Sequence, residues 1–290
     1  MSALLEIEDL RLVLPGAAPI LRGITLTLDA GEVLGLVGES GAGKTMVGKT
    51  VLGLAPERAR LSGAIRFAGA EVMNLGERDR RRLRGRGMAL IPQDPMSALN
   101  PVRRIGAQMT DVIRFHLALD RAAAKVRALE LLDAVHIREP RRVLRQYPHE
   151  LSGGMRQRVL IAIAFACRPR LIIADEPTTA LDVTVQRQIL RLIKELQASV
   201  GTALLFITHD LGVVAKICDR VAVMHGGRIL EAGAAADIFG RPRHDYTRAL
   251  LAATPRYDRP GDALVPVPTA LVARLAAEAA ADDAARGGHA

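Results

Sequence analysis

Residues 38–45 read Gly38-Glu39-Ser40-Gly41-Ala42-Gly43-Lys44-Thr45, which matches the pattern G-x-x-x-x-G-K-[ST]. The apolar run Val33–Val37 precedes this stretch, and a helical pattern from Met46 to Leu54 follows it. The chain is therefore expected to form a strand, a glycine-rich loop and a helix, the context in which this pattern binds phosphate. The alternative is a glycine-rich turn that binds nothing, but the complete pattern between strand and helix argues against it.

The residue types in this loop suit phosphate for separate physical reasons. Its glycines let successive backbone N–H groups turn inward, and the following helix N-terminus favours an anion. Lys44 is predicted to contact the β- and γ-phosphates, and the Thr45 hydroxyl is predicted to bind Mg²⁺. Nucleotide binding is expected to involve the whole loop and the next residue: Gly38, Glu39, Ser40, Gly41, Ala42, Gly43, Lys44, Thr45 and Met46.

A second short apolar run, Leu171–Ala174, is followed directly by Asp175 and Glu176. Such runs are typical of parallel strands buried on both faces, and ligands bind beyond the carboxyl ends of these strands. Asp175 is therefore predicted to contact Mg²⁺, directly or through water, and Glu176 to act as a general base toward water. On these residues alone, a solvated Asp-Glu turn is the alternative.

Residues 151–157 read Leu151-Ser152-Gly153-Gly154-Met155-Arg156-Gln157, and the apolar stretch Val159–Cys167 follows them. Ser152 is a natural helix N-cap, and the two glycines leave the first-turn N–H groups exposed. The segment therefore predicts a second helix start that can bind an anion. The alternative is that it only caps a core helix.

These segments, taken in this order, resemble the ATP-binding cassette (ABC) ATPases. The resemblance implies an α/β fold, the P-loop NTPase cassette, with a RecA-like core and parallel sheet, an N-terminal antiparallel β subdomain and an inserted helical subdomain. It implies ATP and Mg²⁺ as nucleotide and metal. It further implies that Ser152, Gly153 and Gly154 act in trans, on the ATP held by a second ABC ATPase subunit, identical or paralogous.

The same resemblance implies roles for three further polar residues. His209 follows the apolar pattern Thr202–Thr208 and matches the switch histidine, which contacts the γ-phosphate. Gln93 matches the Q-loop glutamine, which approaches Mg²⁺ and the attacking water, and Asp182 ends a segment like the D-loop. The resulting expectations are catalysis by Glu176, His209 and Gln93, metal binding by Thr45, Gln93 and Asp175, and nucleotide binding by Asp182.

Longer strings resemble one branch of this family, the ATP-binding subunits of peptide and nickel importers. These strings are Gln93–Pro101, Tyr147–Met155, Ala174–Thr184 and Arg243–Leu251. The resemblance implies that ATP closes a dimer and hydrolysis reopens it, and that the partners are two transmembrane permease subunits and, indirectly, a solute-binding protein. It also implies a peripheral location on the cytoplasmic face of the plasma (inner) membrane. The solute stays open among peptides, nickel, glutathione and opines.

Cysteine usage and one apolar residue qualify that resemblance. Members of the branch often bind an iron–sulfur cluster through C-terminal cysteines, but no cysteine follows Cys218, so no cluster is expected. Cys167 and Cys218 each lie in an apolar helical pattern and are expected to be buried thiols. Leu14 occupies the position where the family tends to stack adenine on an aromatic ring, and a leucine has no π-face.

The 290-residue pattern predicts an ATP-binding domain over 1–255 and a C-terminal extension over 256–290. Residues 4–14 and 24–30 alternate like antiparallel strands. Apolar residues recur at helical spacing in a helical subdomain at about 95–150: Ile105, Met109, Val112, Ile113, Val126, Leu129 and Leu132. Val221–Gly233 resembles a hairpin, and Ala273–Ala285 is either a marginal helix or a disordered tail.

The net charge is +9, and arginine dominates the basic residues. The run Arg78–Arg86 could bind anionic lipid or nucleic acid, although a solvated helix face is the simpler interpretation. Aromatic residues make up only 3 %, which gives base stacking little support. We therefore expect no nucleic-acid partner, and a soluble ABC ATPase acting on nucleic acid or ribosomes is the alternative function. No apolar run has the length of a membrane span, and acidic residues near Met1 argue against a secretory signal.

Overall fold

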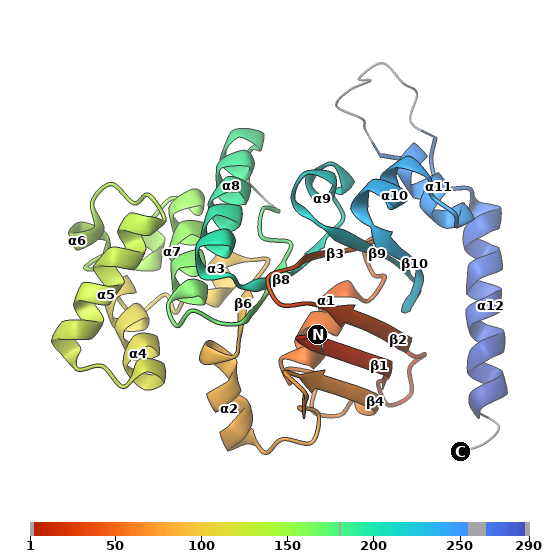
Figure 1. The fold of residues 1–290 in the computed structure, drawn as a ribbon, viewed down its shortest axis with the longest axis horizontal. Coiled ribbons are helices and arrows are strands. Elements are labelled where there is room, and N and C mark those ends of the chain that lie inside the picture. The colour runs from red at the N-terminus through yellow and green to blue at the C-terminus, as the bar shows by residue number, and fades with distance from the viewer. Residues whose placement is uncertain (1–2, 180, 255–264, 288–290) are drawn as a thin grey trace. The chain divides into compact units, whose positions relative to one another are not determined.

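The structure, a computed structural model, describes residues 3–179, 181–254 and 265–287 (Figure 1). Backbone contacts divide the chain into two units. The first unit comprises Met1–Leu75 and Leu205–Ala290, and the second comprises Gly76–Leu204. The boundary falls inside strand β8 (Ala203–Thr208), which is buried along its whole length.

The first unit begins with a four-stranded antiparallel sheet. Its members are β1 (Leu5–Val13), β2 (Leu21–Leu28), β4 (Arg60–Phe67) and β5 (Ala70–Glu71), in the order β2-β1-β4-β5. Alternate side chains of β2, such as Ile24, Leu26 and Leu28, are buried, which is the pattern of a sheet with one covered face. The prediction of antiparallel strands near the N-terminus is confirmed, with β2 beginning earlier than expected.

Three further strands of the first unit support the phosphate loop. The buried strand β3 (Val33–Val37) pairs in parallel with β9 (Arg220–His225), and β9 forms the expected hairpin with β10 (Arg228–Ala234). Its turn residues Gly226 and Gly227 have positive φ values of 52° and 81°, as two-residue hairpin turns require. Helix α1 (Lys44–Val51) follows β3 after the loop, so the predicted strand–loop–helix order is confirmed.

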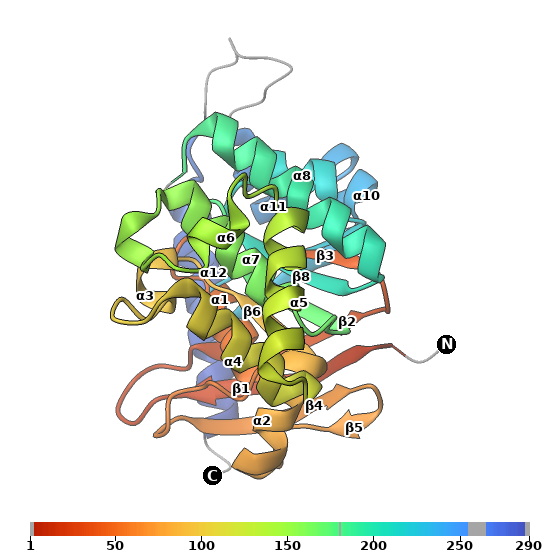
Figure 2. The same cartoon turned by 90° about the vertical axis from the view of Figure 1, so that its left-hand side faces the viewer.

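The second unit combines parallel strands with many helices. Strand β6 (Met88–Ile91) pairs in parallel with β7 (Leu171–Asp175). Its helices are α2 (Glu77–Arg86), α3 (Pro95–Ala98), α4 (Ile105–Leu117), α5 (Arg121–Ala134), α6 (Pro140–Val143), α7 (Gly153–Phe165) and α8 (Val183–Val200). A 3₁₀ turn at Pro148–Glu150 precedes α7. Figure 2 shows α4, α5 and α6 gathered in one helical region, as predicted for the segment after Gln93.

The buried face of α5 differs from the predicted one. In α4, Ile105, Met109 and Ile113 are buried as expected. In α5, however, Val126 is 56 % exposed, and the buried face is built on Ala124, Ala128, Leu131 and Leu132. Small alanine side chains allow a neighbouring helix to approach closely, so burial selected the alanine side of the helix over the valine.

The C-terminal part of the first unit is helical. It contains α9 (Leu211–Ile217), α10 (Ala235–Gly240), α11 (Asp245–Ala252) and α12 (Thr269–Gly287). Between the two expectations for Ala273–Ala285, the structure shows a helix. Leu275 and Ala279 are buried, and Asp283 and Asp282 form ion pairs with Arg22 of β2 and Arg228 of β10. These contacts supply the stability that an alanine-rich sequence does not provide alone. The rest of the predicted extension, 256–264 and 288–290, lies outside the described residues.

Both cysteines are buried, as predicted, but neither lies in a helix. Cys167 follows the end of α7 and Cys218 caps the end of α9. Pro169 disfavours helical backbone at the residue before it, so α7 ends ahead of Arg168. Burial raises the pKa of the Cys167 thiol.

The arginine-rich run forms α2, in which no residue is buried. Glu77 at its start pairs with Arg81 and Arg84. The helix therefore presents a solvated, basic face. Over the described ranges, no helix combines the length and the apolarity that crossing a bilayer requires.

Candidate functional site

The phosphate loop in the first unit has a backbone shape that its glycines make possible. A Cβ atom on Gly38, whose φ is 152°, would lie 2.0 Å from the carbonyl oxygen of Met224 in β9. No other residue type fits so close to a backbone oxygen. Gly43, with φ of 98°, is the N-cap of α1, while Ser40 and Gly41 are exposed at the loop tip. The loop is thus packed against β9 at one end and open at its tip.

Lys44 extends back across this loop. Its side chain is 5 % exposed, and Nζ donates to the carbonyl oxygens of Gly38 at 2.8 Å and Glu39 at 2.9 Å. A buried ammonium group requires such acceptors, and phosphate oxygens are acceptors of the same kind with added negative charge. The position of Lys44 at the first residue of α1 therefore fits an anionic ligand.

Glu39, the second residue of the loop, makes contacts that sequence reasoning missed. Its carboxylate accepts a hydrogen bond from the Tyr246 hydroxyl at 3.1 Å, and His225 Nδ1 lies 3.6 Å from the same oxygen. Burial is the main cause that lowers the pKa of His225, and the nearby Glu39 opposes it. The only signal in the sequence was the position of Tyr246 within Arg243–Leu251. Local pattern could not show that this segment contacts the loop.

In the second unit, the structure brings two of the predicted catalytic residues together. Gln93 follows β6, and its Nε2 donates to Glu176 Oε2 at 3.0 Å. Thr179 Oγ1 donates to the same oxygen at 2.9 Å. Glu176 has a φ of 45°, which is uncommon outside glycine and recurs at functional sites. Two donors thus orient one carboxylate at the end of β7, beside Asp175, which is 7 % exposed.

The start of α7 has the predicted cap. Ser152 Oγ accepts from the backbone N–H of Met155 at 3.3 Å. Ser152 and Gly153 are exposed, and a Cβ atom on Gly153 would meet nothing within 4 Å. Gly154 is closer to its surroundings, because an added Cβ would lie 3.2 Å from Val185 Cγ1. This helix start is therefore open to a ligand from outside the chain.

The other predicted residues lie at element ends. His209 follows β8 in the first unit and is exposed, and Leu14 follows β1 and is half-buried. Asp182 is the N-cap of α8, where Oδ1 accepts from the backbone N–H groups of Thr184 at 3.1 Å and Val185 at 2.9 Å. Capping gives Asp182 a structural role in this chain, and its part in nucleotide binding stays a prediction.

The chemistry of the donor groups fits Mg²⁺ bound together with phosphate. Across the described part of the chain, no cluster of three or more His, Cys, Asp or Glu side chains is placed to hold a metal alone. Mg²⁺ commonly uses one or two protein oxygens and completes its shell with phosphate and water. The Thr45 hydroxyl and the Asp175 carboxylate each carry an oxygen of the kind that this metal prefers.

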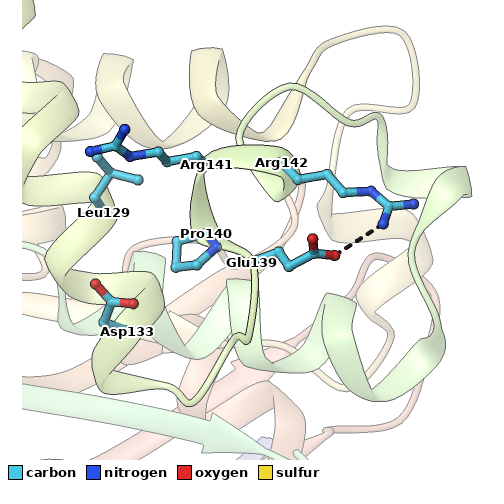
Figure 3. Close-up of a pocket in the computed structure, with 6 residues that line it drawn as sticks. All are labelled: Leu129, Asp133, Glu139, Pro140, Arg141 and Arg142. Carbon is cyan, nitrogen blue, oxygen red and sulfur yellow. Dashed lines mark hydrogen bonds and ion pairs between the residues drawn. The ribbon is translucent and has the colours of Figure 1, made fainter.

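A cavity of about 470 Å³ lies in the helical region of the second unit (Figure 3). It is lined by Leu129, Asp133, Glu139, Pro140, Arg141 and Arg142, from α5, α6 and the residue before α6. Arg142 Nη1 donates to Glu139 at 3.0 Å across its rim. None of the sequence-predicted site residues lines this cavity, so it is not a candidate for the nucleotide site.

The strand, phosphate loop and helix over residues 33–51, together with the oriented Glu176, are the features of a P-loop nucleotide-hydrolysing protein. A family model described as "ABC transporter" matches residues 21–179. A second, described as "Oligopeptide/dipeptide transporter, C-terminal region", matches residues 230–279. The chain belongs to the ABC transporter ATPases, and ATP is its nucleotide. The resemblance to this family and to its peptide-importer branch is confirmed.

Similar proteins and structures agree with this membership. The chain is 47 % identical over 270 residues to the oligopeptide transport ATP-binding protein OppD of Salmonella typhimurium, covering 92 % of this chain and 81 % of that one. It is 47 % identical over 269 residues to the probable D,D-dipeptide transport ATP-binding protein DdpD of Escherichia coli, covering 91 % and 82 %. A solved dimeric post-hydrolysis state of the ATP-binding cassette MJ0796, bound to ADP and Pi, matches with a TM-score of 0.70 at 25 % identity, covering 80 % of this chain and 98 % of that one.

Proposed function

We propose that this chain is the ATP-hydrolysing subunit that energises an importer of peptides or related solutes. The observation that carries the proposal is the joining of two features in one chain. A complete set of ATPase motifs is followed by a region, residues 230–279, that matches the C-terminal region of oligopeptide and dipeptide transporters. Relatives named for oligopeptide and D,D-dipeptide transport match more than nine-tenths of the chain.

In this proposal, the loop at residues 38–46 binds the ATP phosphates. Its backbone N–H groups and the N-terminus of α1 supply donors, and Lys44 exchanges its two carbonyl acceptors for phosphate oxygens. Mg²⁺ bound with ATP neutralises charge on the transferred phosphoryl group. Thr45, Asp175 and the amide oxygen of Gln93 are its proposed ligands, because each offers the oxygen that this metal prefers.

Glu176 is the proposed general base for the attacking water. Its carboxylate is oriented by Gln93 Nε2 and Thr179 Oγ1, which restrict it to one direction. A base that is already oriented needs less reorganisation when the proton moves. His209 is the proposed contact to the γ-phosphate.

The proposed assembly contains two cassettes, two transmembrane permease subunits and, indirectly, a solute-binding protein, on the cytoplasmic face of the membrane. The exposed start of α7 supports a dimer, because Ser152 and Gly153 are exposed and Gly154, which follows them, is partly exposed. Solved neighbours include a cassette described as dimeric. ATP binding would close the pair and hydrolysis would reopen it. No nucleic acid is a partner in this proposal.

Peptide uptake by the source cell tests the proposal. The gene would be replaced by one encoding Glu176→Gln, and uptake of a labelled tripeptide and of labelled nickel would be measured. Loss of peptide uptake with normal nickel uptake is the expected result. Glu57→Gln, at an exposed position, is the matched control and should transport normally. Unchanged peptide uptake with the Glu176 variant would overturn the assignment to peptide import.

A further inference from the structure

Tyr246 is a completely buried residue whose hydroxyl contacts the phosphate loop. It lies in the first turn of α11, within the region that matches the transporter C-terminal model, and its exposed fraction is 0 %. Its hydroxyl donates to Glu39 Oε2 at 3.1 Å. The ring centroid of His225, at the end of β9, lies 4.5 Å from that of Tyr246. Three elements of the first unit therefore meet at the Glu39 carboxylate.

The contact bears directly on the geometry of Lys44. The backbone carbonyl of Glu39 accepts from Lys44 Nζ at 2.9 Å and from the Ala42 N–H at 3.2 Å. The Glu39 side chain is therefore the point at which α11 can fix the backbone that positions Lys44. Burial and the neighbouring Glu39 raise the pKa of the Tyr246 hydroxyl well above its usual range, so it remains a donor at neutral pH.

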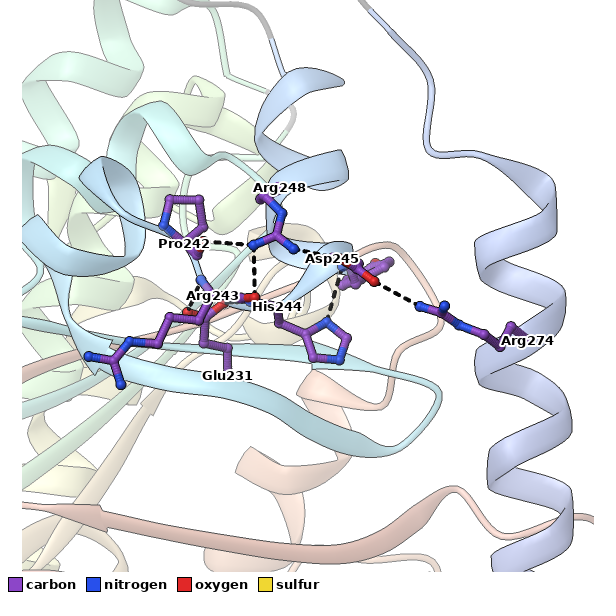
Figure 4. Close-up of polar contacts among 8 residues, drawn as sticks. Glu231, Pro242, Arg243, His244, Asp245, Arg248 and Arg274 are labelled. Atoms are coloured by element: carbon purple, nitrogen blue, oxygen red, sulfur yellow. Dashed lines mark hydrogen bonds and ion pairs between the residues drawn. The ribbon is translucent and has the colours of Figure 1, made fainter.

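The segment that carries Tyr246 is itself held in place (Figure 4). Glu231 of β10 accepts from the backbone N–H groups of Arg243 at 2.7 Å and His244 at 3.1 Å. Asp245, the residue before Tyr246, accepts from Arg274 of α12 at 3.0 Å. The hydroxyl is thus presented to the loop by backbone that β10 and α12 both stabilise.

We propose that Tyr246 is a positioning residue of the ATP site, which holds the phosphate loop in its binding geometry through Glu39. The inference rests on the proposed nucleotide-binding role of residues 38–46. Under it, the C-terminal region contributes to nucleotide affinity in addition to any role in transporter assembly. Tyr246 acts through Glu39 and does not itself contact the nucleotide.

A double-mutant cycle on the full chain tests this role. Tyr246→Phe keeps the buried ring and removes only the hydroxyl, and a fluorescent ATP analogue measures affinity. The net contribution of an ordinary intramolecular hydrogen bond predicts about three- to tenfold weaker binding. In a Glu39→Ala background, the same Tyr246 change should have no further effect, because its acceptor is already gone. Thr254→Val is the matched control: it removes a hydroxyl that donates to the Leu250 carbonyl oxygen of α11, a bond that does not involve the phosphate loop, and should bind normally.

The outcomes separate the inference from the proposed function. Wild-type affinity in Tyr246→Phe, or two changes whose effects simply add, would overturn the positioning role. Absence of nucleotide binding by the wild-type chain would instead refute the proposed function. If Tyr246→Phe does not fold, the ATP-analogue affinities of Glu39→Gln and Glu39→Ala test the positioning role instead. The glutamine keeps an acceptor oxygen for Tyr246, so it should bind the analogue more tightly than the alanine variant, and equal affinities would contradict the proposal.

Discussion

Two helices in this chain, α1 and α7, both begin at glycine-containing segments, but the surroundings of the two segments differ. Helix α1 begins after Gly43 with a lysine that is 5 % exposed and bonded to two loop carbonyls. Helix α7 begins after an exposed Ser152, and an added Cβ on Gly153 would meet nothing. In both places, the positive end of the helix dipole favours an anion. The first start is enclosed by its own loop, whereas the second is exposed; in the proposed function, the exposed start contacts the ATP that another chain holds.

A variant that binds ATP but cannot hydrolyse it should keep both helix starts in contact with ATP, because the dimer stays closed. Glu176→Gln is expected to retain ATP binding and to lose about 10²–10⁴-fold in turnover, because the general base is missing. Steady-state phosphate release and analogue binding measure the two effects. Size-exclusion chromatography with ATP should then show dimer accumulating, since reopening requires hydrolysis. Near-normal turnover would contradict the role given to Glu176.

Removing the charge at the enclosed start should weaken binding itself. Lys44→Ala is expected to lose about 1.5–3 kcal/mol of ATP affinity, the value of a hydrogen bond to a charged group. Equilibrium titration with a fluorescent ATP analogue provides the measurement. Lys49→Ala, five residues further along α1, controls for loss of a positive charge. Equal affinity in wild type and Lys44→Ala would exclude Lys44 from the phosphate site.

A single methyl group should distinguish the two starts. Gly38→Ala places a Cβ against the Met224 carbonyl, so the loop must distort, and we expect about tenfold or greater loss of affinity. Gly153→Ala meets no atom and should leave the monomer's nucleotide affinity unchanged. Gly153→Ala is instead expected to slow turnover in the dimer. Similar monomer affinities for the two variants would remove the distinction between an enclosed and an open start.

Mixing two defective chains tests whether the start of α7 contacts the ATP bound by a second chain. Chains with Lys44→Ala and with Ser152→Arg should each hydrolyse ATP poorly. If homodimers form, each mixed dimer keeps one intact composite site, so ATPase activity should partly recover. Full activity of the isolated Ser152→Arg chain would refute action in trans.

The smallest effect should come from the ion pair that joins α12 to β2. Asp283→Asn removes the carboxylate that faces Arg22 at 2.9 Å, with both side chains partly exposed. A pair of this kind contributes about 0.2–1 kcal/mol, which urea unfolding can resolve. Asp282→Asn, at the neighbouring pair with Arg228, is the comparison. ATP affinity should not change in either variant, because neither aspartate contacts the phosphate loop.

Some parts of this molecule could be predicted from sequence because local chemistry decides them. The run Val33–Val37 is short and apolar at every position, which is typical of a strand covered on both faces. Ser152 caps the start of α7 through a hydrogen bond from the N–H of a residue three positions away, so the segment itself determines that a helix begins there. The Asp-Glu pair likewise follows directly from the end of β7.

Other parts depended on packing that no local pattern expresses. Val126 was expected in the buried face of α5, but Ala124 and Ala128 occupy it, because the approach of neighbouring helices decides which side is covered. Cys167 lies beyond the end of α7, where a proline two residues later stops the helix. In α12, the tail forms a helix because Leu275 is buried and because Arg22 and Arg228, far away in the chain, pair with its aspartates.

By itself, the sequence determined the class of this protein, because the phosphate loop, the serine cap and the Asp-Glu pair are each a short contiguous motif and occur in a recognisable order. Only the tertiary structure decided what surrounds them. It placed the Gln93 amide on Glu176, across a separation of 83 residues. It also placed the Tyr246 hydroxyl on Glu39, across 207. A hydrogen bond forms only where donor and acceptor lie close together in space. For residues far apart in the chain, the folding of the intervening strands and helices decides whether they do.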